Sequence, residues 1–319
     1  MLIDVHAHHS PKQFSDAVQG FAGAAREGMW SKLPHTDSPE HIAKRLELMD
    51  QAGVQMQVLS HGILAPYAQR EEDALKAAHA INDGYADLVR HYPDRFLAYV
   101  SLPLPHIDAS LAEVRRGMDE LGMCGVAMNC SVFDRSTAEQ EFEPLYAEMD
   151  RRGAILYFHP CGNGIRSPMV NDHGLGAVGT LMEDTVLALH LIVRQIPHRF
   201  PNIRVVISHL GGMLPVALNR LDHQLRFFHR DLPEPPSVTA RRFYYDTVGH
   251  GSPAALLCAW KAFGAGQLLP GSDWPVLLID EPYSETFGYI RDVGLPSPDV
   301  EQILERNAPA LFRVQAGLG

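Results

Sequence analysis

The chain has 319 residues, of which 46% are hydrophobic, enough apolar material to bury a sizeable core. A formal net charge of −11 argues against a nucleic-acid-binding protein, because phosphate binding needs a basic surface. The four scattered cysteines form no CxxC pair, so neither a disulfide framework nor a cysteine-type zinc site is predicted. With no signal-peptide pattern and no apolar run near the roughly 18 residues of a membrane span, we expect a cytoplasmic protein.

Short apolar runs rich in β-branched residues alternate with longer amphipathic stretches, a pattern typical of βα units. The predicted strands cover residues 2–8, 54–60, 96–102, 124–129, 154–159, 203–209, 243–248 and 268–273. The first predicted helix lies between Ser38, a typical N-cap, and Gly53. The others cover residues 71–91, 108–121, 142–152, 183–198, 212–229, 253–263, 283–293 and 298–312, and two long loops cover 9–37 and 161–179.

This alternation predicts one (β/α)₈ TIM barrel as a single domain over residues 1–319. A doubly wound open sheet is the alternative, but no glycine fingerprint follows the first strand. In a barrel the carboxyl ends of the strands meet on one rim, where function gathers. The polar residues at the strand ends are therefore the candidate site.

Two imidazoles belong to the first strand, where His6 and His8 point to the same side about 7 Å apart along the backbone. With 17 histidines in the chain, roughly one His-x-His is expected by chance, so this pair alone is a weak signal. His159, His209 and Asp273 end the fifth, sixth and eighth strands, each within two residues of a proline or glycine. Each one singly fits a hydrogen-bonded core residue, but all five on one rim predict a metal site.

The residue types narrow the choice of metal. Imidazoles with one carboxylate suit Zn²⁺, Mn²⁺ or Fe²⁺ better than Ca²⁺ or Mg²⁺. The fourth strand ends at Asn129 and offers no Lys or Glu to bridge two ions. One divalent metal with an open coordination position is therefore expected.

Four motifs resemble those of the amidohydrolase superfamily, in particular its aminocarboxymuconate-semialdehyde decarboxylase-like branch. The resemblance covers nearly the whole chain. The motifs are Asp4-Val-His6-Ala-His8, Phe158-His159-Pro160, Ser208-His209-Leu-Gly-Gly212 and Gly271-Ser-Asp273-Trp-Pro275.

The resemblance implies one zinc or manganese ion held by His6, His8, His159 and Asp273. It implies that His209 acts beside the metal as acid/base or as an extra ligand, with Asp273 also catalytic. Arg220 matches an arginine that reaches the partner subunit's site and binds substrate carboxylate, which implies a homodimer or a dimer-based oligomer. The alternative for Arg220 is a surface arginine on a helix.

The resemblance is incomplete in the first loop. A second substrate-binding arginine of the aminocarboxymuconate enzymes has no counterpart that can be placed there. The substrate is therefore expected to be a small carboxylic acid of muconate or hydroxybenzoate type.

Further polar residues lie at or beyond strand ends. His61, Asn129 and His250 could line the pocket, and Arg166 and His173 lie in the glycine-rich second loop, where substrate contact is plausible. The alternative for each is a loop residue bonded to backbone.

Three functions remain open from the sequence. The first is non-oxidative decarboxylation of an aromatic or muconate-type acid, with Asp273 or His209 moving the proton. The second is hydrolysis or hydration by the same metal site. The third is a non-catalytic binding or scaffold barrel, which an incomplete ligand set would have favoured. The ligand set is complete, so we expect an enzyme.

Overall fold

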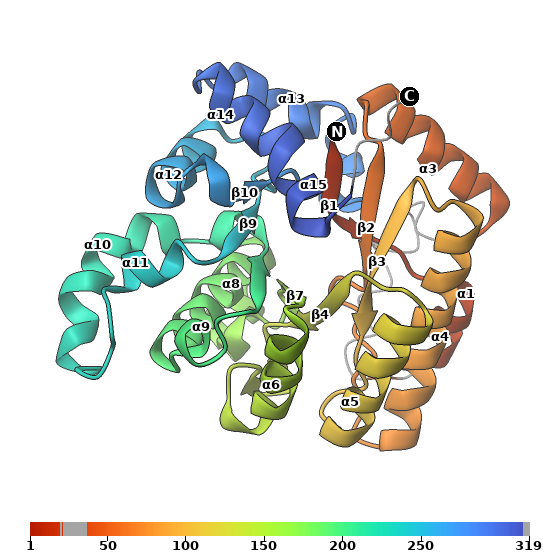
Figure 1. Cartoon of the computed structure of the whole chain (residues 1–319), viewed down its shortest axis with the longest axis horizontal. Helices are drawn as coiled ribbons and strands as arrows, with labels where there is room; N and C mark the ends of the chain where they lie inside the picture. Colours follow the sequence, from red (N-terminus) through yellow and green to blue (C-terminus); the bar gives the residue numbers. More distant parts are fainter. Residues whose placement is uncertain (20, 22–36, 315–319) are drawn as a thin grey trace.

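A parallel eight-stranded barrel organises the molecule (Figure 1). The computed structural model describes residues 1–19, 21 and 37–314. Neighbouring strands follow chain order, so the predicted barrel is confirmed over the doubly wound alternative. The strands are β1 (Ile3–His8), β2 (Met56–Ser60), β3 (Phe96–Ser101), β4 (Gly125–Asn129), β7 (Ile155–His159), β8 (Arg204–Ile207), β9 (Tyr244–Asp246) and β10 (Leu268–Leu269).

The barrel closes between β1 and the segment that follows β10. The Val5 amide donates to the Pro270 carbonyl at 2.9 Å, and the His8 amide donates to the Trp274 carbonyl at 2.7 Å. Ala7 also forms a parallel bridge with Trp274. Because β10 itself is only two residues long, these contacts bring the turn that carries Asp273 against β1.

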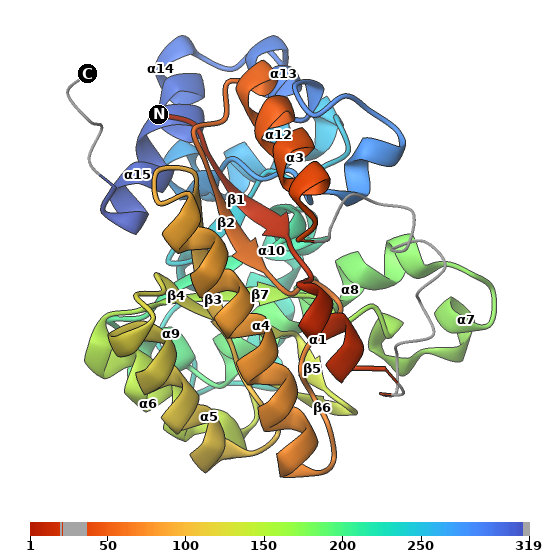
Figure 2. The ribbon, with the colours of Figure 1, turned by 90° about the vertical axis from the view of Figure 1, so that its right-hand side faces the viewer.

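Helices cover the outside of the barrel, and α3, α4 and α5 lie beside β1, β2 and β3 (Figures 1 and 2). In α3, the Ser38 side chain accepts from the His41 amide, and Gly53 ends the helix with φ of 70°, as the sequence predicts. The longer helices are α3 (Pro39–Ala52), α4 (Glu71–His91), α5 (Ile107–Arg115), α6 (Glu143–Arg152), α8 (Gly176–Val193), α10 (Leu214–Gln224), α12 (Pro253–Phe263) and α13 (Glu285–Asp292). The shorter ones are α1 (Lys12–Ala17), α7 (Pro168–Asn171), α9 (Ile196–Arg199), α11 (Pro236–Ala240), α14 (Ser297–Glu301) and α15 (Asn307–Phe312).

The segment before β8 differs from the prediction. The helix predicted from residue 183 begins at Gly176, and the predicted second loop contains α7. The low helix propensity of Gly179 favoured a loop at this position. In the structure a Cβ at Gly179 would lie 2.9 Å from the Gly164 Cα, so only glycine fits there. Close packing of α8 on the preceding turn therefore explains a glycine inside the helix.

Two other predictions are corrected in detail. The helix predicted over 183–198 breaks at Gln195, whose φ is 56°, and continues as α9. The first long loop contains α1, while residues 20 and 22–36 of that prediction lie outside the described residues. A short hairpin, β5 (Ser131–Val132) with β6 (Arg135–Ser136), follows β4 and was not predicted.

Helix α8 is long and apolar enough to cross a membrane by length and composition alone, contrary to the prediction that no apolar run approaches that length. Its Leu187 and Leu191 are buried in the main apolar cluster. Its Glu183 and Asp184 are buried as well and accept hydrogen bonds from neighbouring segments. These contacts are those of a helix that packs on the barrel.

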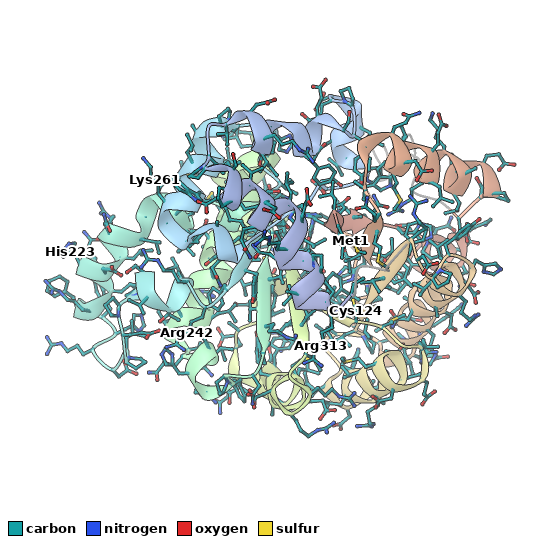
Figure 3. All side chains as sticks on the ribbon, turned by 45° about the horizontal axis from the view of Figure 1, so that its top comes forward. Met1, Cys124, His223, Arg242, Lys261 and Arg313 are labelled. Atoms are coloured by element: carbon teal, nitrogen blue, oxygen red, sulfur yellow. The ribbon has the colours of Figure 1, made fainter. Side chains whose placement is uncertain are left out.

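Apolar side chains fill the barrel at the end where the strands begin. This interior cluster includes Ile3, Val58, Tyr99, Tyr157 and, from α15, Leu311. Figure 3 shows α15 at this end of the molecule, with the labelled Met1, Cys124 and Arg313 around it. The opposite end, where the strands finish, carries the polar residues.

Candidate metal centre

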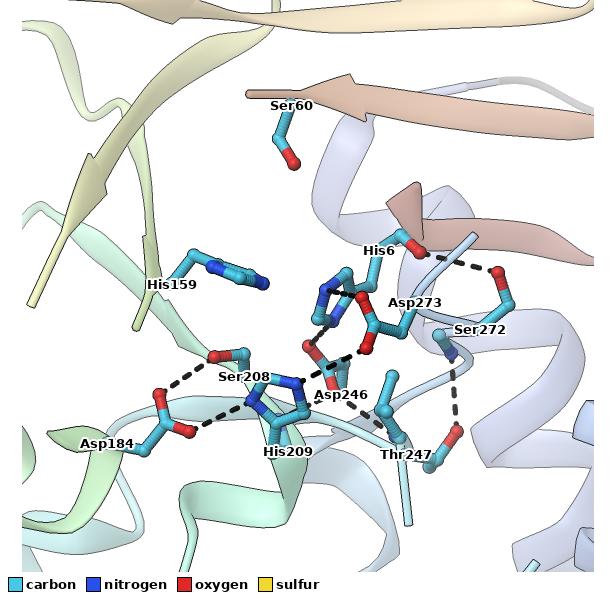
Figure 4. Close-up of polar contacts among 12 residues, drawn as sticks. His6, Ser60, His159, Asp184, Ser208, His209, Asp246, Thr247, Ser272 and Asp273 are labelled. Carbon is cyan, nitrogen blue, oxygen red and sulfur yellow. Dashed lines mark hydrogen bonds and ion pairs between the residues drawn. The ribbon is translucent and has the colours of Figure 1, made fainter. Parts of the chain in front are cut away.

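The predicted ligands converge at the end of the barrel where the strands finish. One side-chain donor atom from each of His6, His8, His159 and Asp273 lies within 4.8 Å of the others, and all four residues are buried. His6 and His8 belong to β1, His159 is the last residue of β7, and Asp273 lies in the turn after β10. Figure 4 shows the His159 ring aimed towards His6 and Asp273.

A β-bulge in β1 places both of its histidines inside the barrel. The pairing of β1 with β2 shifts register between Asp4 and Ala7. Ile3 and Val5 belong to the interior cluster, and the next residue, His6, packs its ring against that of Tyr157 at 5.6 Å. The bulge therefore switches the inward-facing parity of β1, so that apolar residues face inward before it and imidazoles after it.

The distances within the cluster suit one shared cation. His6 Nε2 lies 3.1 Å from His8 Nε2 and 3.2 Å from Asp273 Oδ1, and His8 Nε2 lies 2.9 Å from the same oxygen. Two ligand atoms about 2.1 Å from one ion, at angles of about 90–110°, are about 3.0–3.4 Å apart. The three atoms are therefore spaced as ligands of a single ion.

The outer nitrogens of two rings show which nitrogen faces the cluster. His6 Nδ1 donates to Asp246 Oδ2 at 2.8 Å, and His159 Nδ1 donates to the Pro160 carbonyl at 2.7 Å. His159 Nε2 is then left as a buried lone pair without a hydrogen-bond partner among the described residues. A divalent cation would bind this lone pair and also the closely spaced His6 Nε2, His8 Nε2 and Asp273 Oδ1. The four residues therefore fit a metal ion.

The electrostatics of the cluster agree with this fit. Burial and the neighbouring imidazoles hold the pKa of His159 well below its ordinary value, so its lone pair is available. Burial opposes charge on His6, but Asp246 and Asp273 raise its pKa to about 9. Burial would raise the pKa of Asp273, but His6 and His209 hold it well below the ordinary value. Asp273 is therefore an anionic ligand among imidazoles.

The turn that carries Asp273 is fastened to β1 by Asp4. The Ser272 amide and hydroxyl donate to the Asp4 carboxylate at 3.0 and 2.5 Å, and the Tyr283 hydroxyl donates to it at 2.6 Å. Asp273 has φ of 56°, a left-handed conformation that is uncommon outside glycine. Asp4 holds the turn in this conformation beside the histidines of its own strand.

His209 lies beside the ligand cluster in the turn after β8. Its Nδ1 donates to Asp184 Oδ2 at 2.9 Å, and its Nε2 lies 3.8 Å from Asp273 Oδ2 (Figure 4). Burial opposes the charged imidazole, but Asp184 and Asp273 raise the pKa of His209 well above its ordinary value. The geometry places a proton-bearing imidazole next to the carboxylate ligand.

Two carboxylates of this site were not among the predicted residues. Asp246 ends β9 and accepts from both His6 Nδ1 and the His209 amide, so the strand-end argument used for His159 would have found it. Asp184 lies on α8, inside the predicted helix, but no spacing in the sequence connects it with His209.

The other predicted site residues fall into two groups. His61 and Asn129 are buried beside the cluster and hydrogen-bond to each other at 2.9 Å. Arg166 forms an ion pair with Asp134 at 2.5 Å, and Arg220 lies exposed on α10. His173 and His250 are exposed. Contact of any of these residues with substrate stays a prediction.

The comparisons with known proteins agree with this geometry. The amidohydrolase family model matches residues 3–314. The chain is 27% identical to a gamma-resorcylate decarboxylase of Rhizobium sp. over 330 residues, which covers 94% of this chain and 95% of that one. It is 25% identical to the 2-amino-3-carboxymuconate-6-semialdehyde decarboxylase of Dictyostelium discoideum, with 86% and 82% covered.

A solved structure shares the fold over nearly the whole chain. It is a dihydroxybenzoic acid decarboxylase from Polaromonas sp. with bound manganese and the inhibitor 2-nitroresorcinol. The TM-score is 0.83 at 22% sequence identity, with 99% of this chain and 98% of that one covered.

Proposed function

This chain belongs to the amidohydrolase family, and from that premise we propose that it is a metal-dependent, non-oxidative decarboxylase of a small aromatic or muconate-type carboxylic acid. The observation that carries the proposal is the buried cluster of His6, His8, His159 and Asp273, spaced for one ion. Decarboxylation rather than hydrolysis is supported by two relatives. Both are decarboxylases, and the match to this chain covers more than four fifths of each. Zinc or manganese is the proposed ion, and manganese is the ion bound in the Polaromonas structure.

The reaction replaces a carbon–carboxyl bond with a carbon–hydrogen bond, so the site has to deliver one proton and release CO₂. A divalent ion held by the four ligands would neutralise the substrate carboxylate and a neighbouring oxygen. His209 holds protons on both ring nitrogens, because Asp184 and Asp273 raise its pKa well above the ordinary value, and Nδ1 donates to Asp184 so that the proton on Nε2 faces Asp273. Asp273 Oδ2, 3.8 Å from that nitrogen, passes the proton towards the carbon that loses CO₂. The electron pair of the broken bond stays on that carbon and forms the new C–H bond.

The same proposal includes a homodimer built on α10. Val216 and Arg220 are exposed on this helix four residues apart, so they share its outer face, and Met213, directly before the helix, is exposed as well. Val216 is 78% exposed, and Phe228, just beyond α10, is 82% exposed. A second copy of the chain would cover these apolar side chains and bring Arg220 to a neighbouring site.

Metal content and product analysis test the proposal. Purified wild-type protein should carry about one zinc or manganese ion per chain, and His159→Ala should lose it. The loaded wild type should then release CO₂ from hydroxybenzoates or muconate-type acids, measured by coupled carbonate assay. Turnover of amides or lactones without CO₂ would favour hydrolysis. Protein that binds neither ion, and gains no activity with either, would contradict an enzyme and favour a scaffold.

Dimerisation has a separate test. Sedimentation of the wild type should give twice the chain mass, and Val216→Glu should shift the protein towards the monomer because a carboxylate cannot be buried unpaired. A wild type that sediments as a monomer at all concentrations would contradict the dimer and leave the metal site unaffected.

A further inference from the structure

Asn129 is a buried residue at the end of β4, and all of its polar atoms have partners. Its backbone amide donates to the Tyr67 hydroxyl at 2.9 Å, and its backbone carbonyl accepts from the Thr137 hydroxyl at 2.9 Å. Its side-chain nitrogen donates to two backbone carbonyls, those of Gly62 at 3.0 Å and Pro160 at 3.1 Å. The amide group therefore bridges the loop after β2 and the loop after β7.

The hydrogen-bond partners fix the orientation of this amide. The two carbonyls can only accept, so they must face the NH₂ group, and the Asn129 oxygen must face His61. His61 then donates from Nε2 at 2.9 Å and accepts at Nδ1 from the Ser101 hydroxyl at 2.9 Å. Burial lowers the pKa of His61 to about 4, which agrees with this neutral form. The two carbonyls therefore leave Asn129 one allowed orientation, and His61 donates to its oxygen.

Both bridged carbonyls belong to residues that touch metal ligands. The Pro160 carbonyl also accepts from His159 Nδ1 at 2.7 Å, and that bond sets which nitrogen of His159 faces the cluster. Gly62 packs against the ring of His8, since a Cβ at Gly62 would lie 2.9 Å from His8 Nδ1. One amide group thus fixes the backbone beside two of the four ligands.

We infer that Asn129, hydrogen-bonded to His61, is a positioning residue of the metal centre: it holds His159 and His8 at ligand geometry by bridging the carbonyls of Pro160 and Gly62. This role differs from the substrate contact expected from the sequence. The inference rests on the proposed metal site but not on the reaction catalysed there. Residues that orient metal ligands typically contribute 10–100-fold to metal affinity.

The chain contains a matched control at the other end of the barrel. Asn307 is also buried, and its side-chain nitrogen donates to two backbone carbonyls, those of Ala265 at 2.8 Å and Leu268 at 2.7 Å. Its oxygen accepts from Gln302, as that of Asn129 accepts from His61. The Asn307 side chain therefore makes the same kinds of hydrogen bond as that of Asn129. It lies on α15 and binds the first residue of β10, Leu268, away from the cluster.

The experiment compares Asn129→Ala with Asn307→Ala in metal-free protein titrated with Co²⁺. Both variants should unfold at a lower temperature than the wild type, because each loses two donated hydrogen bonds. Only Asn129→Ala should weaken Co²⁺ binding, by about 10–100-fold, and change the visible absorption of the bound Co²⁺. Asn307→Ala should keep the wild-type affinity within about twofold and the wild-type spectrum.

A second pair of variants covers the case in which Asn129→Ala does not fold. His61→Ala leaves Asn129 in place but removes the donor to its side-chain oxygen, and should weaken Co²⁺ binding. His61→Gln keeps an N–H donor and should recover part of the lost affinity.

Two outcomes would overturn the inference: a Co²⁺ affinity of Asn129→Ala equal to that of the wild type, or equal losses of affinity in the two asparagine variants. In the first case, a raised KM would make Asn129 a substrate contact. A wild type that binds no Co²⁺ would instead contradict the proposed metal site itself.

Discussion

At each end of the barrel a buried asparagine bridges two backbone carbonyls, but the side chains beside it are polar at one end and apolar at the other. Where the strands finish, Asn129 bridges two carbonyls, and the space it frames holds imidazoles and a carboxylate that crowd one another. Where the strands begin, Asn307 bridges two carbonyls, and the space beside it holds apolar side chains such as Leu311. Buried acceptors without enough donors are destabilising, whereas packed apolar groups stabilise. Stability is therefore concentrated at one end and reactivity at the other.

A layer of aromatic rings separates the two ends. The rings of Tyr99 and Tyr157 stack at 5.1 Å with an angle of 6° between their planes. Tyr99 also meets Phe312 of α15, on the side where the strands begin, whereas Tyr157 contacts His6 on the other side. The metal site thus rests on a packed, apolar floor, and substitutions on the two sides of that floor should affect different properties.

The largest expected effect comes from Asp184→Asn at the catalytic end. The neutral amide keeps the shape of the side chain but removes the charge that holds a proton on His209. We expect kcat to fall about 100-fold or more, while metal content stays at the wild-type value. Steady-state kinetics with elemental analysis of the same preparation measures both. Unchanged kcat would exclude His209 as the proton donor, and lost metal would make Asp184 a structural support of the cluster.

The converse substitution is Leu311→Ala at the packed end. Leu311 is 4% exposed and belongs to the interior cluster of Ile3 and Val5, so its truncation leaves a cavity in the core. We expect the free energy of unfolding to fall by about 2–5 kcal/mol, measured by urea denaturation, with unchanged Co²⁺ affinity. A weakened metal site in this variant would show that the aromatic floor does not separate the two ends.

The sequence predicts which residues gather at the catalytic end better than it predicts the backbone conformation of the segments around them. His159 and Asp273 could be placed because one ends an apolar strand and the other lies in the turn after one, so only the direction of each strand is needed. The same rule would have found Asp246. The bulge in β1 could not be predicted, because it arises from pairing with β2 rather than from local propensity.

Tertiary packing explains the remaining differences. Gly179 lies inside α8 because Gly164 approaches its backbone closely, a contact between segments that propensity does not contain. The roles of His61 and Asn129 also depend on tertiary partners, since their bonds join the ends of β2, β3, β4 and β7. Sequence patterns therefore predict which residues gather at this end but not which of them hold the others in place.

A smaller effect is expected from Asp246→Asn. The Asp246 carboxylate accepts from His6 Nδ1 at 2.8 Å, and the amide would weaken that bond and the basicity of His6 as a ligand. We expect metal affinity to fall about 10–100-fold, with a thermal unfolding temperature of the metal-free protein close to that of the wild type. Competition with a coloured chelator measures the affinity. Unchanged affinity would mean that ring packing alone, against Tyr157 and His8, orients His6.

The smallest effect is expected at Ser252, a residue at the catalytic end that we do not expect to influence metal binding. Ser252 precedes α12 on the connection that follows β9, and its hydroxyl accepts from the Ala255 amide at 3.3 Å, satisfying one of the free amides of the first helical turn. Ser252→Ala should lower the free energy of unfolding by about 1 kcal/mol, and Ser252→Gly by only a few tenths. Both should keep the wild-type Co²⁺ affinity in the same titration. A changed Co²⁺ affinity would mean that residues of the helices, and not only those at the strand ends, help to position the metal ligands. Equal losses of stability in the two variants would exclude capping as the cause of the lost stability.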